Sequence, residues 1–287
     1  MKMSDSDIPV RIIDVHNPHQ AKMIEEIQRR AWGTDEAVPH HIFIAASSVG
    51  GVVKAAYVGN KMVGFVFGFM GEFLGKRCMY SHMLAVVPEY QDKNIGYLLK
   101  MEQRNDALSK GLELIVWTYD PLQSKNAYLN INKLGCISRT YLVNHYGEMN
   151  DELNRGVPSD RFMVEWWINS KWVKHNFRNR IKYFEDYKHR DEVAIGLKAI
   201  KEGEIILPEL TKEAGVFVGI EIPRDINHLK RIDPKLGVKW RLATRRAFRH
   251  YIDRTYIVFR YLLYKNEPWK GIYILKKGVD VNNFKDI

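Results

Sequence analysis

The sequence predicts an α/β (α+β) fold, in which a sheet of mixed but mostly antiparallel direction is flanked by helices. Apolar runs with strand character alternate with runs of helical period, and the first strands form a meander. A strand, a polar turn, a helix and a second strand then occupy residues 80–118, an order typical of a parallel pair. Hydrophobic residues make up 46% of the 287-residue chain, which is enough for a sizeable core.

The first half of the chain starts with a strand at 11–15 and helices at 18–33 and 40–51, the first of them ending at Gly33. A Gly-Asn turn at 59–60 predicts a β-hairpin around it. The elements expected after the hairpin are a strand at 77–87, a helix at 96–111, a strand at 112–120, a helix at 125–135, and strands at 137–147 and 160–168.

The second half opens with a polar, charged zone at 169–193, expected to be partly helical. The elements expected beyond it are strands at 204–209 and 216–223, a basic helix at 236–254, and a closing hairpin of strands at 255–264 and 270–278. Its strand–helix–strand order repeats that of residues 80–118, which leaves open a degenerate second copy or an unrelated α+β cap. Two domains are therefore predicted, residues 1–172 and a smaller, basic α+β domain at 173–287.

Charge and cysteine content narrow the class of protein. Residues 1–170 carry a net charge of −1 and residues 171–287 a net charge of +11, so the basicity belongs to the second domain. This charge either attracts an anionic partner or only keeps the domain in solution. Cys78 and Cys136 have no metal-ligand or redox spacing, which favours two buried thiols in a reducing cytoplasm. We expect no membrane span and no secretory signal.

The stretch LAVVPEYQDKNIGYLLK, residues 84–100, places a polar turn between a strand and a helix. A helix that begins directly after a turn offers unpaired backbone N–H groups and the positive end of its dipole, a combination that binds anions. The turn is neither a P-loop nor a GxGxxG fingerprint, so a plain connector is the alternative. The residues of the expected anion nest are Gln91, Asp92, Lys93, Asn94, Ile95, Gly96 and Tyr97.

Two segments carry a resemblance to a known family. The first is residues 84–96, with Leu84, Val86 and Pro88 before the turn and Gln91, Asn94 and Gly96 within it. The second is SKNAYLNINKLGC at 124–136. With the order of the elements, residues 10–170 resemble the GNAT superfamily of N-acetyltransferases, in a poorly characterised family with an added C-terminal region. Asn94 stands where that family usually has glycine, and Asn tolerates the left-handed backbone best after glycine.

The resemblance implies a GNAT-type sheet and an acyl-CoA-dependent N-acyltransferase, with acetyl from acetyl-CoA as the favoured acyl group, transferred to a primary amine by direct attack. The turn would bind the pyrophosphate of CoA, and the backbone of Leu84, Ala85 and Val86 would hold the pantetheine arm and polarise the thioester. No metal is expected. The alternative is a non-catalytic CoA-binding module with a regulatory or interaction role.

The catalytic candidates follow from the same resemblance. His82 would be the base, and Asp120 would bind the substrate ammonium or act on His82; a structural role is the alternative for each. The acid that GNAT enzymes frequently use aligns with Ile131, which cannot donate a proton, so Tyr128 is the first replacement candidate. Asn126 and Asn130, four residues apart on a helix, are candidates to bind pantetheine or substrate.

Two further expectations concern charged residues. Arg241, Arg245 and Arg249 form one stripe of the basic helix, which suggests a row of phosphate contacts or, as we favour, an ordinary solvated face. Asp160 and Arg161 are adjacent and could form an ion pair near the site or a plain surface pair, and we favour the surface pair.

Overall fold

The computed structural model describes residues 9–33, 37–149, 156–211 and 213–279. The described chain divides into two compact units, one formed by residues 9–117 and the other by the remainder from residue 118 onward. The division falls inside a strand, between Trp117 and Thr118. The predicted domain at 1–172 therefore includes parts of both units, and it stays a prediction. Each unit is described by itself.

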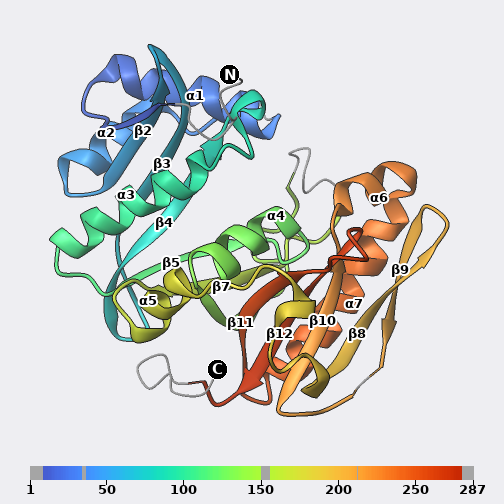
Figure 1. Ribbon diagram of the computed structural model, residues 1–287. Helices are drawn as coiled ribbons and strands as arrows, with labels where there is room; N and C mark the ends of the chain where they lie inside the picture. Colours follow the sequence, from blue (N-terminus) through green and yellow to red (C-terminus); the bar gives the residue numbers. More distant parts are fainter. Residues whose placement is uncertain (1–8, 34–36, 150–155, 212, 280–287) are drawn as a thin grey trace, which may run out of the picture. The chain divides into compact units, whose positions relative to one another are not determined.

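The first unit is a meander followed by a strand–helix–strand segment, as the sequence predicts (Figure 1). Strands β1 to β4 pair antiparallel in sequence order, and β5 pairs parallel to β4. The elements are β1 (Val10–Asp14), α1 (Pro18–Trp32), α2 (His40–Ser48), β2 (Val52–Val58), β3 (Lys61–Phe73), β4 (Lys76–Val86), a 3-10 turn (Pro88–Tyr90), α3 (Ile95–Ser109) and β5 (Leu114–Tyr119).

Alternate residues of β3 show which helix covers which face of this sheet. Phe65 packs edge-on against Trp32 of α1 and Phe43 of α2, with ring centroids 6.2 and 5.9 Å apart. On the opposite face, a Cβ added to Gly68 would lie 2.8 Å from Nε2 of Gln103 in α3. Helices α1 and α2 thus cover one face, while α3 covers the other at a distance that only glycine allows.

The second unit is also built on an antiparallel sheet, in the spatial order β7-β6-β11-β12-β10-β8-β9, with one parallel pair, β10 and β8. The elements are α4 (Ser124–Ala127), a π-helical turn (Tyr128–Lys133), β6 (Ile137–Leu142), β7 (Arg161–Trp167), α5 (Lys171–Arg178), 3-10 turns (Phe184–Asp186 and Arg190–Glu192), β8 (Val193–Glu202), β9 (Ile205–Leu210), β10 (Phe217–Pro223), α6 (Ile226–Ile232), α7 (Pro234–Ile252), β11 (Tyr256–Leu263) and β12 (Lys270–Lys277).

Helix α7 lies against β6 and against β8, β9 and β10. Its Phe248 enters an aromatic cluster with Phe162 of β7 and Tyr273 of β12, at centroid distances of 4.6 and 5.3 Å. Trp240 at the start of the helix is fully buried, and its indole N–H donates to the carbonyl of Ile206. The basic helix therefore also has an apolar side, which packs into the core through Trp240 and Phe248.

The strand–helix–strand segments of the two units differ in topology. In the first unit β4 and β5 are direct neighbours, whereas in the second unit β12 lies between β10 and β11. The sequence also missed β8 and α6. Strand β8 does not alternate strictly: Gly196, Leu197 and Ala199 are buried and its last three residues are exposed, so it lacks the period of two by which a strand is recognised in a sequence.

Taken together, the structure confirms the predicted fold class, a mixed α/β architecture with a largely antiparallel sheet flanked by helices. No helix in the described ranges is both long and apolar enough to cross a membrane.

Candidate functional site

The turn between β4 and α3 has the backbone of an anion nest. Asp92 and Asn94 are both left-handed, with φ angles of 61° and 64°. Asn94 is the N-cap residue of α3, and its side chain makes no capping hydrogen bond there. The prediction that asparagine takes the left-handed position is confirmed. The first turn of a 15-residue helix therefore presents backbone N–H groups that no N-cap side chain covers.

The side chains of this turn are open to solvent. Gln91, Asp92, Lys93 and Asn94 are all exposed, while Ile95 is buried and anchors the start of the helix. Nε2 of Gln91 donates to the carbonyl of Val86, 3.1 Å away, which ties the turn to the end of β4. Gly96 and Tyr97 are half-buried in the first helical turn. This arrangement suits a multiply charged anion that approaches from solvent.

Strands β4 and β5 separate early. Their paired residues are Met79 with Ile115 and Tyr80 with Val116, and no later pair occurs among the described residues. Leu84, Ala85 and Val86 lie beyond this fork and bond on their other side to β3. One edge of β4 at these three residues is therefore not paired with β5. A backbone edge of this kind can bind an extended, amide-bearing ligand.

His82 lies in a β-bulge just beyond the same fork. Phe67 of β3 pairs with Met83 and Gly68 pairs with Ser81, so His82 is the extra residue. Its exposed ring faces Phe67 and Phe69, with centroids 6.0 and 5.9 Å away. Desolvation by the surrounding side chains lowers the pKa of His82 below its ordinary value. The imidazole is therefore neutral at pH 7 and able to accept a proton.

The opposite face of the fork holds a group that the sequence analysis missed. Lys100 of α3 is buried, and its Nζ donates to Oγ of Ser81 at 2.6 Å and lies 3.5 Å from the ring centroid of Trp117. Ser81 and Trp117 directly follow the last paired residues of β4 and β5. An ammonium group thus lies at the apex of the fork. The sequence offers only a weak sign of this site. Lys100 and Gln103 are three residues apart and therefore lie on one face of the helix, where both are buried and Nζ of Lys100 donates to Oε1 of Gln103.

The same helix shows how tertiary packing differs from the apolar pattern. Leu98 is apolar, yet 36% of its surface is exposed, while Lys100 and Gln103 are buried. The helix faces the glycine-rich side of β3, where long polar side chains fit over the missing Cβ atoms.

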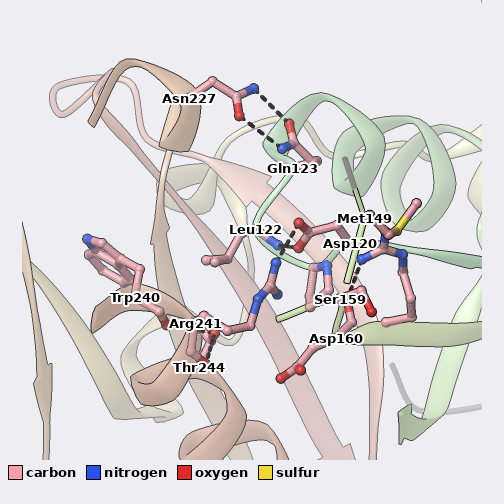
Figure 2. A network of polar contacts seen from close by, with 12 residues as sticks. Asp120, Leu122, Gln123, Met149, Ser159, Asp160, Asn227, Trp240, Arg241 and Thr244 are labelled. Carbon is pink, nitrogen blue, oxygen red and sulfur yellow. Dashed lines mark hydrogen bonds and ion pairs between the residues drawn. The ribbon is translucent and has the colours of Figure 1, made fainter. Parts of the chain in front are cut away.

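Asp120 lies at the end of β5 and belongs to the second unit. Its Oδ2 accepts from Nη2 of Arg241 at 2.5 Å, and its Oδ1 accepts from the backbone N–H of Leu122 at 2.8 Å (Figure 2). Both carboxylate oxygens therefore already have partners within the unit. Burial by itself lowers the pKa of Arg241, but the charge and hydrogen bond of Asp120 outweigh it and raise the pKa above the ordinary value.

Asp160 forms a second ion pair with the same helix. Its two oxygens accept from Nε and Nη2 of Arg245 at 2.8 and 2.7 Å, and Tyr141 donates its hydroxyl to it. Burial opposes ionisation, but these bonds prevail and lower the pKa of Asp160. The expectation of a surface pair with Arg161 is wrong, because both residues are buried and Asp160 pairs with Arg245.

The arginine stripe of α7 is consequently not a solvated row. Arg241 is 2% exposed and paired with Asp120, and Arg245 is paired with Asp160. Arg249 lies 3.8 Å from Asp253 within the helix. The sequence could not show whether these arginines face water or buried carboxylates, because the spacing of a basic stripe is the same in both cases.

The helix predicted at 125–135 is irregular. After α4, residues 128–133 form a π-helical turn, a feature frequent at functional sites. Asn126 is exposed, whereas Asn130 is buried, so the two amides do not share one environment. Tyr128 is half-buried, and Ile131 is buried in the core.

The predicted site residues thus fall into two groups. His82, the backbone at 84–86 and the turn at 91–97 belong to the first unit, and Asp120, Asn126, Tyr128 and Asn130 belong to the second. A hollow of about 620 Å³ between α1 and the β2–β3 hairpin contains none of them. In the described part of the chain, no group of three or more His, Cys, Asp or Glu side chains is arranged to hold a metal ion.

Comparison with known families agrees with the sequence. Residues 21–129 match the acetyltransferase (GNAT) family, less than half of the chain. They contain strands β2 to β5, and with them the fork and the turn, but not β1. The predicted resemblance is confirmed for this segment. No curated protein matches the chain.

Several solved structures are similar to part of the chain. The ribosomal-protein-S18-alanine N-acetyltransferase from Escherichia coli is 16% identical with a TM-score of 0.44, over 55% of this chain and 92% of that one. The putative acetyltransferase yncA from Salmonella typhimurium, solved with acetyl-CoA, is 16% identical with a TM-score of 0.46, over 56% and 95%. Arabidopsis thaliana NAA60, in complex with a bisubstrate analogue, is 18% identical with a TM-score of 0.45, over 56% and 99%.

Proposed function

We propose that this chain, whose residues 21–129 belong to the GNAT acetyltransferase family, is an acyl-CoA-dependent N-acyltransferase that transfers acetyl from acetyl-CoA to a primary amine. One observation carries the proposal. The unpaired edge of β4 leads directly into a left-handed turn and an uncapped helix N-terminus, so one continuous backbone surface offers partners to an amide-rich arm and then to a pyrophosphate.

The proposed donor site follows the chain in order. The backbone of Leu84, Ala85 and Val86 binds the pantetheine arm, and one of their N–H groups polarises the thioester carbonyl. The turn at 91–97 binds the pyrophosphate, with Lys93 contributing positive charge near the anion. Acetyl-CoA supplies the acyl group, and no metal takes part in the proposal.

The acceptor amine must lose a proton before or during attack on the thioester. His82 is the proposed base. It is exposed, lies at the fork, and its lowered pKa keeps the ring neutral at pH 7. The amine nitrogen attacks the thioester carbon, His82 takes the ammonium proton directly or through water, and the C–S bond then breaks to release CoA.

The leaving thiolate requires a proton or a positive charge. Ile131 supplies neither, so Tyr128 remains the first candidate and Lys100 at the apex of the fork is a second. Lys100→Met and Tyr128→Phe separate them, because only the variant that removes the true group lowers kcat at saturating acetyl-CoA. Asp120 is proposed to act through its ion pair with Arg241 rather than on the acceptor, since both its oxygens have partners.

The alternative is a CoA-binding module without catalysis, which the absence of a tyrosine at position 131 favours. The nature of the acceptor amine is not specified by either reading.

Two experiments test these readings in sequence. Calorimetry with acetyl-CoA should show saturable binding, and the absence of binding at millimolar ligand would refute both readings. A free-thiol release assay over a panel of small amines, amino acids and peptides then separates enzyme from binder. Release above the rate without amine supports the transferase, and binding without release on any amine supports the module.

A further inference from the structure

The second unit contains a buried arginine that has no carboxylate partner among the residues that the structure describes. Arg260 of β11 is 4% exposed, and its Nε is enclosed without a hydrogen-bond partner. The guanidinium lies over the ring of Trp172, with Cζ 4.8 Å from the centroid. Desolvation lowers the pKa of Arg260 to about 10, and Tyr187 offsets this only in part. A cation that is destabilised in this way calls for a counter-charge.

Two neighbouring side chains also end in enclosed polar atoms without partners. Tyr187 is 2% exposed, its ring centroid lies 5.8 Å from Cζ of Arg260, and its hydroxyl is unpaired. The ring of His189 is 5.7 Å from that of Tyr187, and its Nε2 is unpaired as well. Glu192 holds the other ring nitrogen at 2.7 Å, so Nε2 donates only when the imidazole is protonated.

These groups belong to different parts of the chain. Arg260 comes from a strand, whereas Tyr187 and His189 come from the segment between the two 3-10 turns. His189 is held in turn by Phe217, which stacks on it at 4.9 Å. Buried polar atoms in proteins nearly always have partners, and a guanidinium beside a phenol offers donors in a fixed geometry.

The contrast with Arg241 indicates what is missing. Both guanidinium groups are almost completely buried, but Arg241 has Asp120 at 2.5 Å, and its pKa is raised rather than lowered. Arg260 has the burial without the anion. An oxyanion that accepts from Arg260 and Tyr187 would supply both the counter-charge and the missing hydrogen bonds.

We propose that Arg260, Tyr187 and His189 form a binding site for a small oxyanion, a phosphate or carboxylate group, in the basic second unit. Trp172 forms one wall of the site, since the guanidinium lies over its ring. The proposal does not depend on acyl transfer. It gives the charge of +11 on residues 171–287 a specific role, because that charge raises the local concentration of anions around the site.

The test is a titration of the full-length protein with sodium phosphate and, separately, with sodium acetate at constant ionic strength in sodium chloride. The midpoint of urea unfolding should rise saturably for the wild type with at least one of the two anions. Arg260→Met keeps the length and apolar stem of the side chain, and we expect it to weaken the anion's affinity at least tenfold, on the order expected for charge-assisted hydrogen bonds. Comparing the two anions distinguishes a phosphate site from a carboxylate site.

Matched variants separate this site from other effects of charge. Arg180→Met removes an exposed arginine of the same unit and should leave the anion response unchanged. The turn at 91–97 would bind phosphate equally in the wild type and in Arg260→Met, so only the difference between their responses reports on Arg260. Tyr187→Phe should weaken the same response by a smaller factor.

Two results would overturn the proposal. One is a wild-type protein with no saturable response to either anion, which would mean that water alone satisfies these groups. The other is an anion response of the same size and midpoint in the wild type, Arg260→Met and Tyr187→Phe. If Arg260→Met does not fold, Arg260→Lys and Tyr187→Phe carry the comparison, because both keep a polar or aromatic group in place.

Discussion

The turn after β4 and the buried face of α7 differ in where their polar groups lie: those of the turn are exposed to solvent, and those of α7 form ion pairs inside the fold. At the turn, Asp92 and Asn94 take left-handed backbone conformations, the side chains are exposed, and the helix N-terminus has no side-chain cap. On α7, Arg241 and Arg245 each have a carboxylate within 2.7 Å. Under the proposed function the backbone N–H groups of the first region bind a ligand, while the second region uses its charged groups within the fold. Substitutions should therefore change binding or turnover in the first and stability in the second.

The largest expected effect is on the buried ion pair. Asp120→Asn should lower the free energy of unfolding by about 3–5 kcal/mol, because it leaves the Arg241 guanidinium buried without a counter-charge. Urea denaturation measures this. The double variant Asp120→Asn/Arg241→Met should recover part of the loss. A single variant as stable as the wild type would show that the pair contributes nothing to the fold.

His82→Ala, unlike Asp120→Asn, should lower activity and leave stability almost unchanged. We expect kcat/KM to fall about 100-fold, the lower range for loss of a general base, with stability almost unchanged because the ring is exposed. In the wild type, the neutral ring is the active form, so kcat/KM should decrease as the pH falls through the pKa of His82, which lies below the ordinary value. His19→Ala, an exposed histidine of the same unit, is the control. An unchanged rate and pH profile in His82→Ala would exclude the base.

The ion pair of Asp160 should make the free energy of unfolding depend on pH. The pKa of its carboxyl is lowered in the folded protein, so it stabilises the fold fully above its unfolded pKa, near 3.9. That contribution is lost as the pH falls through the folded pKa. Asp160→Asn should cost about 2 kcal/mol at pH 7, within the range for a hydrogen-bonded charge. Unfolding titrations at several pH values should show this difference shrinking below pH 4; a constant difference would contradict the linkage.

The smallest expected effect is at Asn94. Its φ of 64° costs a residue with an ordinary Cβ about 1–2 kcal/mol, which glycine avoids. Asn94→Ala should therefore weaken CoA binding about fivefold in calorimetry, and Asn94→Gly should bind at least as well as the wild type. Equal affinities for both variants would mean that the left-handed turn does not contribute to the donor site.

Arg260 has features of both regions, and for this reason it is informative. It is buried like Arg241, and both guanidinium groups have an enclosed nitrogen without a hydrogen-bond partner, but only Arg241 has a carboxylate beside it among the described residues. Under the proposed oxyanion site, substitution of Arg260 removes the part of the stability that depends on the anion. That conditional effect distinguishes a ligand site from a structural ion pair such as the one between Arg241 and Asp120.

Helix ends and turns could be predicted from the sequence, because they depend on residues that are adjacent in the chain. Gly33 ends α1, the Gly-Asn turn joins β2 and β3, and Asn94 takes the left-handed position before α3, because each follows from local backbone preferences. The apolar periods and the resemblance to the GNAT family, which the family comparison bears out over residues 21–129, could also be recognised. The residues of the turn and of the strand and helix beside it follow one another along the chain.

Which charged residues are buried, and which partners they have, depends on three-dimensional packing that the sequence does not show. Lys100 meets Ser81 and Trp117, and Arg241 meets Asp120, because strands distant in sequence come together around them. The sequence shows a lysine or an arginine at a helical spacing in every case. Whether such a cation faces water, a carboxylate or no partner depends on the elements packed against it, and that in turn determines its pKa, its contribution to stability and its capacity to bind an anion.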